Sequence, residues 1–438
     1  MKKVTSALAL AALVGTPAAA MANVEFGGDL DVRAFSTDTL DLSGQPDPAE
    51  ENFNENFGNR EQRTGANQRI RLTGSFETDG GVSVNARLNL MNDRWTGDAS
   101  GGRNVGVDDG AIDDLGDEAP FSNRNHRNVE LDYGYVSLPL AGGMLNVGRQ
   151  TSNWNPMGLT TTDDRRDRIS YVRPLGGGHT GIFAYDRRQA SDPTNRATDG
   201  NQPFIAFLGP LAEGVQYGFL VATWDGGSSG ADGAGYVLNG ATLVSPYIEG
   251  QAGDLNYGVG MHYLGDGRNL YTEDTFAGYV HGGFQMTPEF KLEGQVFHAA
   301  DGALVANGYD SYSSLINNSP DHDVSPTSIG LLNLSGLAAS GGPGTEGQDG
   351  MERTLVAARG TYTMMDWTFK GALGWVNYDD GDASARDEDV VFADLQAHYA
   401  LTPSTTVYAT AGYADLDEDE NGFRDEVYAT SLNLNVQF

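Results

Sequence analysis

The last residues of the chain alternate between two kinds of side chain with a period of two. The intervening residues are polar or small, and one face carries Tyr428, Thr430, Leu432, Leu434, Val436 and Phe438. This period is typical of a β-strand with one apolar and one polar face. A soluble sandwich and a membrane barrel both contain such strands, so this stretch alone leaves the two classes open.

The same alternation recurs along the whole chain and predicts eighteen strands. The alternation is weak in the sixth, seventh, eighth and tenth predicted strands, so a barrel of sixteen strands is the alternative. In chain order the predicted strands span 24–35, 69–77, 82–90, 129–138, 144–150, 169–174, 180–187, 202–208, 215–221, 236–244, 255–263, 276–286, 290–296, 353–364, 367–375, 391–399, 406–414 and 426–438.

Short turns and long loops follow each other regularly between these strands. The segments 78–81 and 401–404 are tight turns, whereas 36–65, 95–127 and 301–351 are long polar loops. Outer-membrane barrels show this asymmetry, with short periplasmic turns and long outer loops. Backbone groups in hydrocarbon all need partners, so a membrane-spanning sheet has to close. The pattern predicts an all-β, transmembrane antiparallel β-barrel of 16–18 strands, with a polar, water-filled lumen.

The chain starts with a predicted secretory signal peptide, residues 1–22. Lys2 and Lys3 precede the apolar stretch 7–14, and Ala20 and Ala22 form a small-x-small cleavage site. No run of eighteen apolar residues follows, which excludes a transmembrane helix. A formal net charge of −33 argues against nucleic acid as a partner, and the absence of cysteine excludes disulfides. Residues 23–438 are therefore predicted to be one barrel domain.

At the fifth predicted strand the chain resembles the general porins of Gram-negative outer membranes. The likeness rests on the run Gly148-Arg149-Gln150, a third loop at this place, Thr-Pro turns at Thr287 and Thr402, the signal peptide and the terminal Phe438. The resemblance implies a homotrimer that contacts outer-membrane lipid and lipopolysaccharide. It also implies Phe438 as the insertion signal read by the barrel-assembly machinery.

The resemblance further implies a pore constriction. Its loop, about 151–168, would fold into the pore with Asp163, Asp164 and Asp167 mixed with Arg165, Arg166 and Arg168. The facing pore wall would contain Arg33, Arg69, Arg71, Arg87 and Arg149. Strict alternation places the first four in the lumen but puts Arg149 on the outer face, unless Gly148 kinks the strand. Two alternatives stay open: the arginines balance lumen carboxylates, or the charged run is an exposed, self-paired loop.

No other motif indicates a chemical step or a bound cofactor. The segment from Asp417 to Gly422 opens like a calcium loop, but Tyr428 stands where a bidentate glutamate is needed. No Gly-x-Ser-x-Gly nucleophile motif occurs. We therefore expect neither an enzyme, nor a metal site, nor a cofactor.

The sequence thus predicts an outer-membrane porin. It would be a passive diffusion channel for small hydrophilic solutes and ions, with a charge bias at the constriction. Two alternatives are a substrate-specific channel for a sugar or an organic acid, and a surface structural or adhesive barrel.

Overall fold

The computed structural model describes residues 23–39, 61–94, 129–157, 159, 161–189, 200–226, 240–265, 274–300, 311–313, 352–379, 388–416 and 426–438. The predicted signal peptide, the calcium-like segment after Asp417 and most of the predicted long loops lie outside these residues. Among the described residues, no helix is long and apolar enough to cross a membrane.

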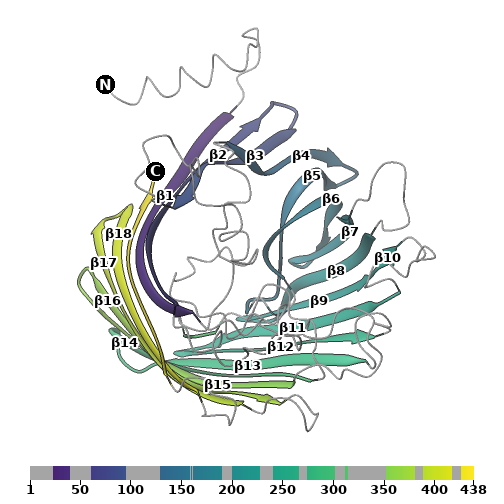
Figure 1. The fold of residues 1–438 in the computed structure, drawn as a ribbon. Coiled ribbons are helices and arrows are strands. Elements are labelled where there is room, and N and C mark those ends of the chain that lie inside the picture. Colours follow the sequence, from purple (N-terminus) through teal and green to yellow (C-terminus); the bar gives the residue numbers. More distant parts are fainter. Residues whose placement is uncertain are drawn as a thin grey trace, which may run out of the picture.

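The described residues form one closed antiparallel sheet of eighteen long strands (Figure 1). A two-residue strand, β10 (Asp225–Gly226), pairs in addition with β8. The long strands are β1 (Asn23–Thr39), β2 (Glu61–Glu77), β3 (Ser83–Arg94), β4 (Glu130–Leu140), β5 (Gly143–Trp154), β6 (Thr161–Gly176), β7 (His179–Gln189), β8 (Gly200–Ala212), β9 (Val215–Thr223), β11 (Thr242–Ala252), β12 (Leu255–Gly265), β13 (Thr275–Gln285), β14 (Phe290–Ala299), β15 (Glu352–Met364), β16 (Trp367–Asp379), β17 (Glu388–Thr402), β18 (Thr405–Leu416) and β19 (Glu426–Gln437).

The predicted fold class is confirmed, and the larger of the two predicted strand counts is correct. One predicted strand is misplaced: the tenth was expected at 236–244, but β11 spans Thr242–Ala252. The observed strand contains Pro246, which lacks the N–H that a central strand needs. The sheet accommodates Pro246 opposite Phe219 of β9, and the pairing of β11 with β12 skips Ser245 and Pro246.

The outer face of the barrel is apolar along almost every strand. Many large hydrophobic side chains there are exposed, as expected of groups that contact lipid rather than a protein core. They include Phe26, Val84, Ile169, Phe219, Val280, Leu373, Leu395 and Leu432. Trp367 and Tyr399 lie beside the short turn at Asp366, with ring centroids 4.7 Å apart, where aromatic side chains suit the headgroup level.

The barrel closes between its first and last strands. β1 pairs with β19 from Asp29 opposite Gln437 to Thr37 opposite Ala429. Gly28 and Phe438 add two backbone hydrogen bonds, 2.8 and 3.0 Å long. A Cβ at Gly28 would lie 2.7 Å from the Phe438 ring and 2.5 Å from a backbone oxygen of β2. The terminal aromatic ring therefore needs a glycine beside it at this closure.

Candidate pore constriction

The hairpin of β5 and β6 leaves the barrel wall partway along its strands. β5 pairs with β4 only up to Arg149, and β6 pairs with β7 only from Asp167 onward. Beyond these residues the two strands pair only with each other, as far as Trp154 opposite Thr161. We call residues 150–166 the inward hairpin, since Figure 1 shows β5 and β6 curving into the barrel. A loop over 151–168 was expected; the structure corrects this to two strands joined at 155–160.

The inward hairpin reaches β11, several strands further round the barrel. Trp154 Nε1 donates to the main-chain oxygen of Ser245 at 3.0 Å and to its Oγ at 3.1 Å. The indole also packs edge-on against Tyr247, with the ring centroids 5.5 Å apart. Gly218 makes room for Tyr247, because a Cβ there would lie 2.1 Å from the tyrosine ring. The hairpin is therefore fixed against β11 at its far end.

The turn at the tip of the inward hairpin follows from its local sequence. Asn155 has a positive φ of 62°, a conformation that asparagine tolerates better than most residues. Its Oδ1 accepts a hydrogen bond from the backbone N–H of Leu159, 2.9 Å away. Met157 and Leu159 are buried. A sequence that reads as an irregular loop thus forms a turn in which two described apolar side chains are buried.

The hairpin covers an inner surface that is apolar. This apolar wall combines inward residues of β8, β9, β11 and β12 with two neighbouring positions, and it consists of Ala206, Leu220, Ala222, Trp224, Ala241, Leu243 and Leu264. The prediction of an inward face that is polar almost throughout does not hold for this part of the barrel. Apolar inner residues are stable because Trp154 and partly buried neighbours such as Ile182 and Phe204 shield them from water.

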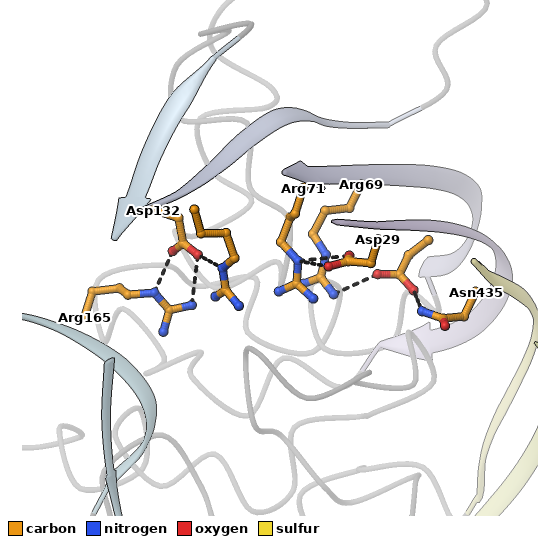
Figure 2. A network of polar contacts seen from close by, with 8 residues as sticks. Asp29, Arg69, Arg71, Asp132, Arg165 and Asn435 are labelled. Carbon is orange, nitrogen blue, oxygen red and sulfur yellow. Dashed lines mark hydrogen bonds and ion pairs between the residues drawn. The ribbon is translucent and has the colours of Figure 1, made fainter. Parts of the chain in front are cut away.

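The inner face beside the closure is charged instead. Arg33, Arg69, Arg71 and Arg87, which we call the arginine wall, lie there as predicted from alternation. Arg69 pairs with Asp31 at 2.9 Å, and Asn435 of β19 donates to the same carboxylate at 2.6 Å. Arg71 Nε lies 2.9 Å and 3.0 Å from the two oxygens of Asp29 (Figure 2). Arg69 and Arg71 are therefore paired with lumen carboxylates, an arrangement that one of the two alternatives describes.

Asp132 joins this arginine wall to the inward hairpin. A register shift between β3 and β4 pairs Arg87 with Tyr133 and Leu88 with Leu131, which leaves Asp132 as a bulge. Such a bulge redirects a side chain. The Asp132 carboxylate contacts both Arg87 and Arg165, the latter at 2.6 Å (Figure 2). One arginine of the wall and one of the hairpin thus share a single carboxylate.

Arg149 and Asp167 do not line the pore in the structure. They lie opposite each other on the face that carries Val147 and Ile169, and they form an ion pair at 2.9 Å. Both side chains are about half exposed, at 46% and 56%. Gly148 has an unusual φ of 132°, yet the alternation continues through it. The predicted roles of Arg149 in the pore wall and of Asp167 in the constriction are therefore wrong.

The other charged residues predicted for the constriction loop lie in different surroundings. Arg168 lies inside the barrel, where it pairs with both oxygens of Asp186 at 2.5 and 2.7 Å and donates to Ser152 at 2.8 Å. Arg166 lines a cavity beside it. Asp163 and Asp164 belong to β6, but their side chains lie outside the described part of the chain. Alternation along β6 explains why neighbouring arginines and aspartates face in opposite directions.

A second polar group in the lumen was not expected from the sequence. His281 Nε2 lies 3.0 Å from both oxygens of Glu249, and His281 Nδ1 lies 3.4 Å from the hydroxyl of Tyr312. Burial and nearby Glu293 raise the pKa of Tyr312 to about 12, so this hydroxyl stays protonated. The Arg359 guanidinium lies 4.3 Å from the centre of the Tyr312 ring. Tyr312 stands in a predicted loop without periodicity, so only the three-dimensional structure brings it into the lumen.

A closed barrel with an apolar outer face, a charged lumen and a hairpin folded into that lumen defines a membrane channel. Residues 9–419 match the model of the Gram-negative porin family, so the chain belongs to this family and resides in the outer membrane. No curated protein sequence matches the chain.

Solved structures with the same fold are outer-membrane porins of distant sequence. OccAB4 of Acinetobacter baumannii has a TM-score of 0.55 at 9% identity, over 97% of this chain and 100% of that chain. OprD of Pseudomonas aeruginosa has a TM-score of 0.53 at 10% identity, over 94% and 95%. A BenF-like porin of Pseudomonas fluorescens Pf-5 has a TM-score of 0.55 at 11% identity, over 95% and 98%. At these identities the likeness shows the fold alone.

Proposed function

We propose that the protein is a diffusion channel whose solute path runs between the arginine wall and the inward hairpin. The observation that carries this proposal is the contact of Trp154 with Ser245 and Tyr247, which fixes the hairpin across the lumen. The hairpin covers the apolar wall, so hydrophilic solutes pass on the polar side. The work of the protein is then to exclude large solutes and to favour small ones by charge, without a chemical step.

The charge bias should be weak, because the arginines are paired with carboxylates. Exposed acidic groups attract cations to the mouths, but salt screens them over about 8 Å at physiological ionic strength. We expect a preference for cations at low salt that diminishes as salt is added. Trimeric assembly, contact with lipopolysaccharide and insertion by the barrel-assembly machinery stay predictions.

The proposal is tested by planar-bilayer recording of the purified protein. The wild type should give discrete conductance steps, and polyethylene glycols below a sharp size limit should reduce them. A variant in which 155–160 is replaced by two glycines should admit larger polymers. An unchanged size limit in a folded variant would show that the hairpin does not narrow the path.

A substrate-specific channel is the second candidate, favoured by the cluster of Glu249, His281 and Tyr312 in the lumen. Liposome swelling separates the two candidates. A diffusion channel passes a neutral sugar, an organic anion and an organic cation of similar mass at similar rates. A specific channel passes one of them far faster and saturates as its concentration rises.

A further inference from the structure

A cavity lies between the inward hairpin and the wall that it covers. Its volume is about 200 Å³, and its lining comes from the hairpin and from β5 to β12. One side is apolar and includes Phe204, Leu220 and Leu243, whereas the other includes Gln150 and Arg168. Arg168 is already neutralised by Asp186, 2.5 Å away. The cavity is therefore amphipathic: Arg168 is paired with Asp186, and Arg166, the other arginine of the lining, has a partner as well.

Two buried side chains that line this cavity have unused hydrogen-bonding groups. Within the described part of the chain, Trp224 Nε1 and both ring nitrogens of His262 have no hydrogen-bond partner. Trp224 is 4% exposed and His262 is fully buried. An unpaired buried polar group is costly and needs an explanation. Here a bound molecule that supplies the partners provides one.

The kinds of missing partner indicate the ligand's chemistry. Neutral histidine has one nitrogen that donates and one that accepts, whereas the indole N–H only donates. A hydroxyl group serves both kinds, because its oxygen accepts and its hydrogen donates. An apolar cavity of about 150 Å³ holds benzene, so the present one has room for a single six-membered ring with a small substituent.

We propose that this cavity binds a small uncharged ring compound that carries a hydroxyl group, of the phenol class. The ring packs against Phe204 and Leu220, and the hydroxyl meets Trp224 and His262. This site lies behind the hairpin rather than on the proposed solute path, so it does not depend on the proposed function.

The test is calorimetric titration of the folded, detergent-solubilised barrel with phenol and with benzene as probes. Phenol should bind about tenfold more tightly than benzene, since only phenol can hydrogen bond to the two side chains. His262→Leu, which keeps a similar volume, should reduce phenol affinity about tenfold and change benzene affinity less than twofold. Trp224→Phe should act in the same direction.

Ala206→Leu measures the uptake of the probes without the cavity, because Ala206 is fully buried and lines the cavity. Filling the cavity should abolish binding of both probes and leave only their partition into micelles. Ala372→Leu adds the same bulk at a buried position of β16 outside the cavity lining and should retain binding. Wild type that binds phenol no better than Ala206→Leu would show that only water occupies the cavity. Equal affinity for phenol and benzene would exclude the hydroxyl site, and this comparison needs no variant to fold.

Discussion

The inner face of β1–β3 carries arginines and aspartates, whereas that of β8, β9 and β11 carries alanine and leucine. Both faces point towards the same lumen and come from strands with the same apolar outer side. The arginine wall is stabilised by ion pairs such as Arg69 with Asp31. The apolar wall is stabilised by burial under Trp154 of the inward hairpin. The two inner faces therefore differ in what stabilises them: ion-pair partners on one, and cover by the hairpin on the other.

The largest effect on folding should come from a change at the closure between β1 and β19, because β1 carries part of the arginine wall. Gly28→Ala places a methyl group 2.5 Å from a backbone oxygen and 2.7 Å from the Phe438 ring, so most of the protein should fail to fold. Gly27→Ala is the matched control, because its nearest contact is 3.4 Å. The fraction of heat-modifiable, folded barrel on a gel measures both. Equal folding of the two variants would show that the ring does not need this space.

Removal of Trp154 should release the inward hairpin from the apolar wall. Loss of a buried tryptophan costs about 3–5 kcal/mol, and the hydrogen bonds to Ser245 are lost as well. Trp154→Ala should therefore give larger and noisier single-channel conductance. Trp367→Ala removes the same side chain from the outer face and should leave conductance unchanged. If both variants conduct like the wild type, the hairpin is held by other contacts.

Replacement of Arg69, Arg71 and Arg87 by serine should give the inner face at the arginine wall a net negative charge. Asp29 and Asp31 then lose these arginine partners and Asp132 keeps only Arg165, so the preference for cations should increase. The reversal potential across a salt gradient measures this change. The opposite triple variant, with these aspartates replaced by asparagine, should shift the potential towards anions. Unchanged potentials in folded variants would place the solute path elsewhere.

The smallest effect should come from Arg149, which the structure places on the outer face. The double variant Arg149→Ser with Asp167→Ser removes an ion pair that lies outside the lumen. Reversal potential and conductance should both match the wild type. A shift in reversal potential as large as that of the triple arginine variant would show that Arg149 lines the pore.

The sequence predicted most of the fold because a strand exposed to lipid alternates visibly. The eighteen strands, the closure at Phe438 and the inward position of four arginines all follow from this period of two. The tenth strand, in which the alternation is weak, is misplaced, and the observed β11 contains Pro246, which lacks a backbone N–H. In the structure the neighbouring strands tolerate the missing N–H, since the pairing of β11 with β12 skips this position.

Alternation in the sequence therefore determined which residues share a face, including the outward position of Arg149. It could not determine what covers each face, because that depends on contacts between residues far apart in the chain. Trp154 meets Ser245 across 91 positions, and Arg165 meets Asp132 through a bulge that only the pairing of β3 with β4 reveals. The inward hairpin, the apolar wall and the cavity between them were thus decided by the tertiary structure, since burial by distant strands leaves no periodic signal.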